Sequence, residues 1–131
     1  MHKILLVDDE VATRDLYQLY LERNGYCVIT ASSVAEALQI LARDRICLAL
    51  IDVFLNGDNG MELLKGIKAA RPDFPVVMMS GLGPEESLGG EALTGGALAF
   101  FPKGLPLDPL LHHVKQAVPR CSIKPARVSG L

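Results

Sequence analysis

The sequence of 131 residues lacks a long apolar run and has no excess of basic residues. No apolar stretch approaches the roughly 18 residues that a membrane-spanning helix needs. The apolar run near the N-terminus, Ile4 to Val7, is too short for the core of a signal peptide. The formal net charge is −2, which excludes the global basic surplus that nucleic-acid binding uses. We therefore expect a cytoplasmic protein that binds neither a membrane nor nucleic acid directly.

Cysteine and histidine are scarce, and neither shows the spacing of a metal site. The residues concerned are Cys27, Cys47, Cys121, His2, His112 and His113. We expect the cysteines, odd in number, to be free thiols in a reducing cytoplasm, and the histidines to be surface residues. Half of the residues are hydrophobic, which supplies a core and argues against disorder.

Five short apolar runs, typical of β-strands, alternate with longer segments of helical period. The runs cover residues 4–7, 26–30, 46–51, 76–79 and 97–101. The third is apolar at every position, which suits a strand buried on both faces of a parallel sheet. This alternation predicts an α/β fold of the flavodoxin-like (βα)5 type. We expect a three-layer sandwich whose five-stranded parallel sheet has the order 2-1-3-4-5.

Local signals mark where the expected helices begin and end. Gly25 stands where a cap belongs after a helix over residues 11–24. Ser33 to Glu36 has the form of a capping box, and Pro72 stops the third helix. Asp108-Pro109 offers an N-cap and a proline in the first helical position of the last helix.

The composition changes at Pro119. Residues 119–131 contain three basic residues and no acidic residue. We interpret residues 1–118 as one domain and residues 119–131 as a basic tail or the start of a linker.

Reactive side chains follow four of the expected strands. Asp8 and Asp9 come after the first strand and Asp52 after the third. Ser80 comes after the fourth strand, and the fifth leads to Lys103. In such sheets the site lies beyond the carboxyl ends of the strands, at the switch point between strands 1 and 3. We therefore expect three carboxylates, a hydroxyl and an ammonium to converge there.

The chemistry of such a cluster is limited. Packed carboxylates repel one another and resist ionisation, and a hard divalent cation such as Mg²⁺, which prefers oxygen ligands, relieves this. A carboxylate beside the metal can act as a nucleophile on phosphorus. The metal and Lys103 would neutralise charge on the phosphoryl oxygens, and Ser80 would donate a hydrogen bond to one of them.

This arrangement resembles the receiver domain of two-component response regulators. That family has Asp-Asp after strand 1, Asp after strand 3, Ser or Thr after strand 4 and Lys after strand 5. The matching segments lie between residue 3 and about residue 118, and they are Ile4–Glu10, Asp52–Leu55 with Gly60, Met79–Gly81 and Gly96–Lys103. The resemblance implies a signalling module that catalyses only its own phosphorylation and dephosphorylation.

The resemblance also implies a role for each site residue. Asp52 is the phospho-acceptor. Asp9 and Asp52 ligate Mg²⁺ through their side chains and Phe54 through its backbone carbonyl, while Asp8 contacts the metal through water. Lys103 pairs with Asp52 and then with the phosphoryl group.

Two further residues act as switches in this interpretation: Ser80 supplies a hydroxyl and Phe100 an aromatic ring. The donor is a histidine kinase or a histidine phosphotransfer protein. Phosphorylation shifts a two-state equilibrium on the face formed by the fourth helix, fifth strand and fifth helix. That face controls a downstream protein partner or a fused output domain, and it could pair two copies of the chain as a homodimer.

Three features depart from the family pattern. Gly104 stands where proline usually follows the lysine, which leaves the geometry of that loop open. Asn56 occupies another position where proline is common. Gly89 and Gly90 fall inside the expected fourth helix, where each costs about 1 kcal/mol relative to alanine. We therefore predict a short, irregular or mobile fourth helix.

Phe54 and Leu82 lie two residues beyond Asp52 and Ser80. In the family these positions influence how readily water attacks the phosphoryl group. Because both are apolar here, we hypothesise a relatively long-lived phosphorylated state.

Three other functions are possible on this fold. A flavin-binding module needs a phosphate-binding loop after the first strand, and Asp8-Asp9-Glu10 would repel a phosphate. An aspartate-nucleophile phosphohydrolase needs a second acid where Phe54 stands. A degenerate receiver, used as a phosphorylation-independent interaction scaffold, is favoured only by the missing proline at Gly104.

Overall fold

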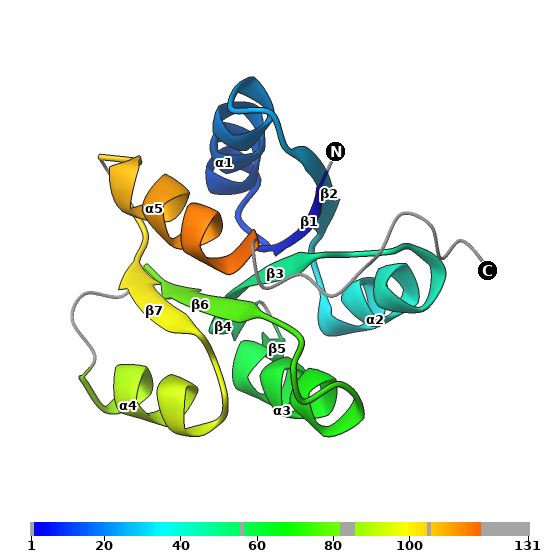
Figure 1. Cartoon of the computed structure of the whole chain (residues 1–131). Helices are drawn as coiled ribbons and strands as arrows, with labels where there is room; N and C mark the ends of the chain where they lie inside the picture. Colours follow the sequence, from blue (N-terminus) through cyan, green and yellow to red (C-terminus); the bar gives the residue numbers. More distant parts are fainter. Residues whose placement is uncertain (1, 56, 82–85, 105, 119–131) are drawn as a thin grey trace.

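A computed structural model describes residues 2–55, 57–81, 86–104 and 106–118. Five strands form one parallel sheet in the order β2-β1-β3-β6-β7, which is 2-1-3-4-5 when these strands are counted along the chain. The predicted topology is therefore confirmed (Figure 1). The strands of this sheet are β1 (Lys3–Val7), β2 (Cys27–Ala31), β3 (Leu48–Asp52), β6 (Val76–Ser80) and β7 (Ala99–Pro102).

Helices cover both faces of the sheet, so the fold has three layers (Figure 1). One face packs against α1 (Val11–Arg23) and α5 (Asp108–Ala117), and the other against α2 (Val34–Arg43), α3 (Gly60–Ala70) and α4 (Glu86–Thr94). Alternate residues of a strand point to opposite faces, so Leu50 packs toward α1 and α5 while Ile51 packs toward the other helices. Every residue of β3 is buried, as its continuous apolar run predicted.

Two of the predicted strands begin too early, because their first residues complete the preceding helix. The backbone N–H of Tyr26 donates to the carbonyl of Leu21 at 3.2 Å, and that of Ala97 donates to Ala92 at 2.9 Å. The residue before Tyr26 is Gly25, whose φ of +94° allows the left-handed turn that ends α1. As a result β2 begins at residue 27 and β7 at residue 99.

Two other boundaries also differ from the prediction. β3 begins at Leu48 rather than at residue 46. Ile46 and Cys47 are buried, but the paired residues of β3 begin only at Leu48, opposite Ile4 of β1. The helix α5 begins at Asp108, with Leu107 in the N-cap position. The carbonyl of Leu107 accepts the N–H of Leu111 at 3.3 Å. Asp108 is therefore inside the first turn, where its charge complements the helix dipole, and it is not the cap.

The start of α2 has the predicted cap in a modified form. The Ser33 side chain accepts a hydrogen bond from the N–H of Glu36 at 3.2 Å. The Glu36 carboxylate accepts the N–H of Ser32 at 2.8 Å, one residue before the position expected of a capping box. Oδ2 of Asp58 accepts the N–H of Val34 at 3.0 Å. The start of α2 is thereby tied to the loop that follows β3.

That loop contains a small hairpin that the sequence did not predict. Its strands are β4 (Phe54–Leu55) and β5 (Asp58–Asn59). Gly57, with a φ of +79°, provides the left-handed backbone that so short a connection needs. The described part of the fourth helix, α4, has nine residues, and its shortness, irregularity or mobility remains a prediction.

Two expectations about the cysteines and histidines were wrong. Cys27 is a free thiol, but Cys47 is disulfide-bonded. His113 is half-buried, with its ring stacked on Phe101 at a centroid distance of 5.2 Å. Within the described ranges, no helix has the length and apolar character needed to cross a bilayer.

Candidate functional site

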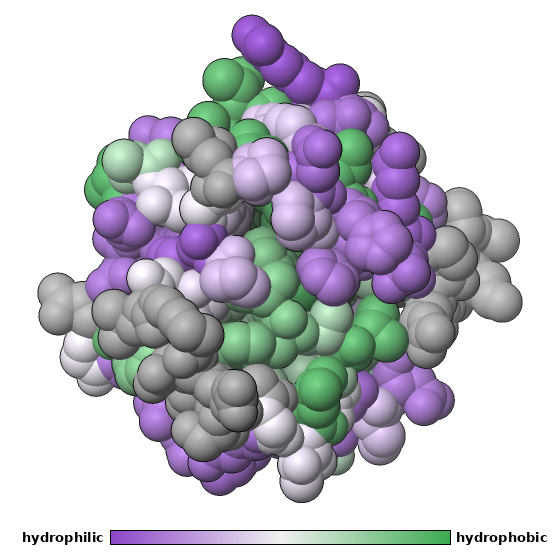
Figure 2. Space-filling model, turned by 90° about the vertical axis from the view of Figure 1, so that its left-hand side faces the viewer, coloured by the Kyte–Doolittle hydropathy of each residue, from purple (hydrophilic) through white to green (hydrophobic). Residues whose placement is uncertain are grey.

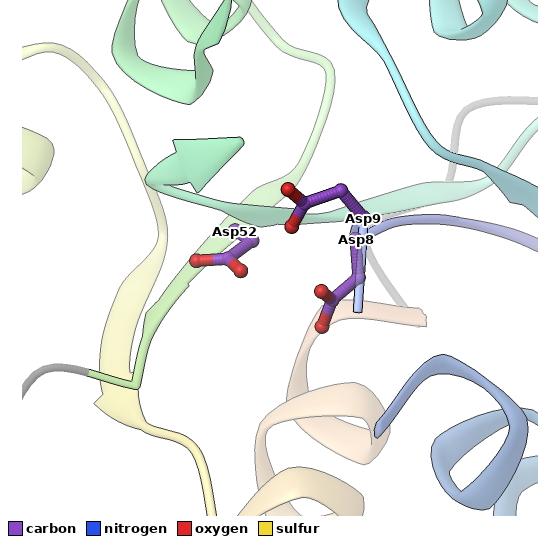
Figure 3. Close-up of side chains that lie close together, drawn as sticks. All are labelled: Asp8, Asp9 and Asp52. Carbon is purple, nitrogen blue, oxygen red and sulfur yellow. The ribbon is translucent and has the colours of Figure 1, made fainter. Parts of the chain in front are cut away.

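Three aspartates from two neighbouring strands meet at one end of the sheet (Figure 3). Asp8 and Asp9 follow β1, and Asp52 is the last residue of β3. These strands pair in parallel, with Val7 in register with Ile51. One carboxylate oxygen from each aspartate lies within 4.8 Å of the others. The carboxylates that were predicted to converge therefore do so.

Lys103 connects two of these carboxylates. Its Nζ donates to Oδ2 of Asp52 at 2.8 Å and to Oδ2 of Asp8 at 2.9 Å. The Lys103 side chain is 8% exposed and that of Asp8 is fully buried. Oε1 of Glu10 forms a longer ion pair with Nζ, at 3.6 Å. Because a buried charge requires a partner, Lys103 is the protein's counter-ion for this acidic pair.

The second oxygen of each buried aspartate is held by the backbone. Oδ1 of Asp52 accepts the N–H of Phe54 at 3.2 Å. Oδ1 of Asp8 accepts the N–H of Glu10 at 2.9 Å. Hydrogen bonds to a backbone two residues further on are typical of aspartate in turns. The direction of both carboxylates is therefore fixed by the loops that follow β1 and β3.

Burial and charge act in opposite directions on the ionisable groups. Removal from water raises the pKa of Asp52, while the hydrogen bond and charge of Lys103 lower it. Burial alone would lower the pKa of Lys103. Its hydrogen bonds to Asp52 and Asp8 outweigh burial and hold that pKa above the ordinary value. The ammonium therefore keeps its charge at neutral pH, beside a carboxylate that is costly to ionise.

A hollow of about 390 Å³ opens beside Asp52. Its wall is formed by Asp9, Glu10, Asp52, Phe54, Gly81 and Lys103. Phe54 is 45% exposed and forms part of this wall. A Cβ atom on Gly81 would lie 3.2 Å from Cε of Lys103, so glycine at this position leaves room for the lysine. The hollow leaves space for a small group beside the carboxylate.

Ser80 and Phe100 come from the neighbouring strands β6 and β7. Ser80 is fully buried, and its carbonyl accepts the N–H of Lys103 at 2.8 Å. Phe100 is half-buried, lies in register with Met78, and packs against the core beneath α2, α3 and α4. The structure thus places Ser80 next to the lysine loop, and Phe100 on the edge strand.

The donor set suits a hard divalent cation. Asp8, Asp9 and Asp52 offer only oxygen ligands, and Mg²⁺ prefers such ligands together with several waters. Two of the three carboxylates already require a positive partner, which Lys103 supplies. The adjoining hollow leaves space for the waters that Mg²⁺ retains.

Sequence reasoning missed two residues of this region. Glu10 accepts the Thr13 hydroxyl at 2.6 Å and pairs with Lys103. The Thr13 hydrogen bond, with the charge of Lys103, lowers the pKa of Glu10. The position of Glu10, directly after Asp8 and Asp9, was a signal in the sequence that it belongs to the site. Tyr17 is the second: its hydroxyl accepts the N–H of Gly104 at 3.0 Å, and no sequence pattern distinguished it from a core residue.

Comparison with known proteins gives a consistent result. The family model described as "Response regulator receiver domain" matches residues 4–115. Sporulation initiation phosphotransferase F of Bacillus subtilis is 32% identical over 117 residues, covering 89% of this chain and 94% of that protein. The nitrogen assimilation regulatory protein NtrX of Azorhizobium caulinodans is 38% identical over 119 residues, covering 89% of this chain but 26% of its own length.

Solved structures show the same similarity. A CheY-like response regulator receiver domain protein from Methanospirillum hungatei has a TM-score of 0.83 and 30% identity, covering 91% of this chain and 94% of that one. The response regulator TrrA of Thermotoga maritima, solved in complex with Mg²⁺-BeF, has a TM-score of 0.81 and 26% identity, and the match covers 89% of this chain and 99% of that one. The chain belongs to the response regulator receiver family, a signalling module rather than a true enzyme.

Proposed function

We propose that Asp52 accepts a phosphoryl group from a phosphohistidine of a histidine kinase or histidine phosphotransfer protein. One observation carries the proposal: Asp52 is buried, bonded to Lys103, and open to a hollow beside two other aspartates. The similarity to a protein named as a phosphotransferase, and to one solved with Mg²⁺-BeF, supports it.

The transfer balances as a simple displacement. A carboxylate oxygen of Asp52 forms a bond to phosphorus while the phosphorus–nitrogen bond of phosphohistidine breaks. The electron pair of that bond leaves with the imidazole, which takes a proton from water. Lys103, already between Asp52 and Asp8, is placed to neutralise charge on the phosphoryl oxygens.

Mg²⁺, held by Asp9 and Asp52 with Asp8 nearby and the carbonyl of Phe54 as a further ligand, would supply additional positive charge to the carboxylates and the phosphoryl group. The protein's own residues would orient the nucleophile and supply a second positive charge. They hold the nucleophile in a fixed direction through the N–H of Phe54 and keep a cation against it.

Phosphorylation adds a charge of roughly −1.5 to −2 at Asp52. In our proposal the Ser80 hydroxyl and Lys103 bind the new phosphoryl oxygens, and Phe100 changes its position on β7. This would shift a two-state equilibrium on the α4–β7–α5 face. Seen from the side on which β7 is the edge of the sheet, the molecule has an apolar area across the middle of its surface (Figure 2).

That face would control a downstream protein or a fused output domain, and it could also pair two copies of the chain. The chain spans almost the whole of phosphotransferase F but about a quarter of NtrX and of the transcriptional regulatory protein GlrR of Escherichia coli. The lengths of these relatives therefore fit both arrangements, a separate partner protein and a fused output domain.

A direct test uses the full chain with Mg²⁺ and either acetyl phosphate or beryllofluoride, beside Asp52→Asn. We expect the wild type alone to gain one phosphoryl group by mass spectrometry. We also expect its amide NMR signals near Ser80 and Phe100 to shift with beryllofluoride. Equal behaviour of wild type and Asp52→Asn would reject the proposal and favour a phosphorylation-independent scaffold.

A further inference from the structure

A buried phenol on α1 is bonded to the loop that carries Lys103. Tyr17 is 1% exposed and packs in the apolar cluster beneath α1 and α5. A buried tyrosine hydroxyl needs a hydrogen-bond partner. The hydroxyl of Tyr17 finds it in the N–H of Gly104, at 3.0 Å. This bond joins residues that are 87 positions apart in the chain.

Glycine at position 104 makes this bond possible. The φ of Gly104 is +132°, a conformation that side-chain-bearing residues rarely adopt, although no atom within 4 Å would obstruct a Cβ. A proline, which the family usually has here, fixes φ near −65° and has no N–H to donate. Gly104 therefore has a backbone N–H that proline lacks, and the hydroxyl of Tyr17 accepts its hydrogen bond.

Lys103 is consequently held on both sides of its Cα. Its own N–H donates to the carbonyl of Ser80 at 2.8 Å, and the N–H of the next residue donates to Tyr17 at 3.0 Å. Between these two anchors the side chain extends to Asp8 and Asp52. A change in the second anchor would be passed to the position of Nζ.

The phenol also lies close to the charges of the site. A hollow of about 220 Å³ has Tyr17, Lys103 and Gly104 in its wall. Burial raises the pKa of Tyr17, the Gly104 hydrogen bond and the charge of Lys103 lower it, and the charges of Asp8 and Asp52 raise it. Tyr17 thus lies within electrostatic reach of the reacting carboxylate, although it does not contact it.

We infer that Tyr17 is a positioning residue for phosphoryl transfer, and that its hydrogen bond to Gly104 takes the place of proline in holding Lys103 against Asp52. The inference rests on the proposed function of Asp52. It assigns Tyr17 no contact with the substrate and no role in proton transfer.

The first measurement is the rate at which acetyl phosphate with Mg²⁺ phosphorylates the full chain. Tyr17→Phe removes one hydroxyl and keeps the packed ring. Loss of one hydrogen bond predicts a rate roughly three- to tenfold lower. Tyr20→Phe is the matched control, because Tyr20 lies on the same helix and packs against the same cluster. We expect its rate to equal that of the wild type.

A second measurement distinguishes positioning from general loosening of the fold. If Tyr17 acts through the lysine, Tyr17→Phe will slow transfer in the wild type but not in Lys103→Met, because coupled residues are non-additive. If Tyr17→Phe lowers the rate of phosphorylation by the same factor in the wild type and in Lys103→Met, the inference is overturned.

A third measurement does not depend on phosphorylation. In the unphosphorylated ¹⁵N-labelled protein, Tyr17→Phe should make the Gly104 amide exchange with solvent roughly three- to tenfold faster, and it should shift the Lys103 ammonium signal, while Tyr20→Phe changes neither. If the wild type takes no phosphoryl group yet these signals change, the proposed function fails, and what stands is that Tyr17 holds Lys103 in position against Asp52. An unchanged lysine signal would overturn that role.

Discussion

The Nζ atom of Lys103 lies 2.8 Å from Oδ2 of Asp52 and joins the last strand of the sheet to its centre. The same atom lies 2.9 Å from Asp8. Both carboxylates are buried, and this ammonium forms an ion pair with each of them. Stability and metal binding should therefore both depend on Lys103.

We expect Lys103→Met to lower the free energy of unfolding at neutral pH by about 3 kcal/mol, since it leaves buried carboxylates without their cation. Mg²⁺ should restore part of this loss, and it should stabilise the variant more than the wild type, because the lysine no longer competes for the carboxylates. Urea unfolding with and without Mg²⁺ measures both effects.

Lys65→Met is the control for this prediction. Lys65 pairs with Glu62 at 3.7 Å, and both side chains are 67% exposed, so its loss should change stability by less than about 0.5 kcal/mol. A loss in Lys103→Met no larger than in Lys65→Met would contradict the proposed charge balance. Equal stabilisation of wild type and Lys103→Met by Mg²⁺ would contradict the competition for the carboxylates.

Gly60 fits directly against the end of β3, at Asp52. A Cβ atom at this position would collide with the backbone carbonyl oxygen of Asp52. We expect Gly60→Ala to cost about 2 kcal/mol in stability and to lower the rate of phosphorylation of Asp52. Gly66→Ala, on the same helix with nothing within 4 Å of its Cβ position, should be neutral or slightly stabilising. Similar unfolding curves for the two variants would argue against this close contact.

Much of the fold and part of the site could be predicted from the sequence, because their signals are local. An apolar run that ends in an acid places Asp8, Asp9 and Asp52 at the ends of adjacent strands, and parallel topology brings them together. The starts of two strands could not be predicted from apolar character. The N–H groups of Tyr26 and Ala97 are used to end the preceding helices, and a hydrophobicity pattern does not show this.

The Tyr17–Gly104 bond escaped prediction for a different reason. A tyrosine at helical spacing has the same pattern as any core residue, and its hydroxyl partner is a backbone group 87 positions away. The absence of proline at position 104 drew attention to the loop, but only three-dimensional packing shows which atom uses the extra N–H.

His113 should make stability depend on pH. Burial lowers its pKa, and the charge of His112 adds to this. A histidine whose pKa is lower in the folded than in the unfolded state contributes stability above the unfolded pKa of about 6.5, and this is lost as the pH falls through the folded pKa. We therefore expect the wild type to lose stability as the pH falls below about 7.

His113→Phe should remove this component of the pH dependence. Phenylalanine keeps a ring to stack on Phe101 and eliminates Nδ1, which is buried and has no hydrogen-bond partner among the residues that the structure places. We also expect a gain of about 1 kcal/mol at neutral pH. Urea unfolding at several pH values tests both points, with His112→Gln as a control that keeps the larger part of the pH dependence, the part caused by burial of His113. A wild-type pH profile retained in His113→Phe would show that other groups cause it.

Phe54 should protect the phosphorylated state from water. Its ring forms part of the wall of the hollow beside Asp52 and is 45% exposed. Leu82, the other residue named in this hypothesis, lies outside the described residues. We expect Phe54→Asn to accelerate loss of the phosphoryl group, because an amide can hold an attacking water where the ring excludes one. A barrier lower by about 1.4 kcal/mol corresponds to a tenfold shorter lifetime.

The lifetime can be measured by mass spectrometry after acetyl phosphate is removed. Leu38→Asn is the matched control: Leu38 is 49% exposed on α2 and is not part of the wall of the hollow beside Asp52, so this substitution should leave the lifetime unchanged. If Phe54→Asn keeps the wild-type lifetime while still accepting the phosphoryl group, exclusion of water by the ring is not what limits hydrolysis. The rate would then depend on the groups that hold the phosphoryl oxygens, of which Lys103 is the first to test.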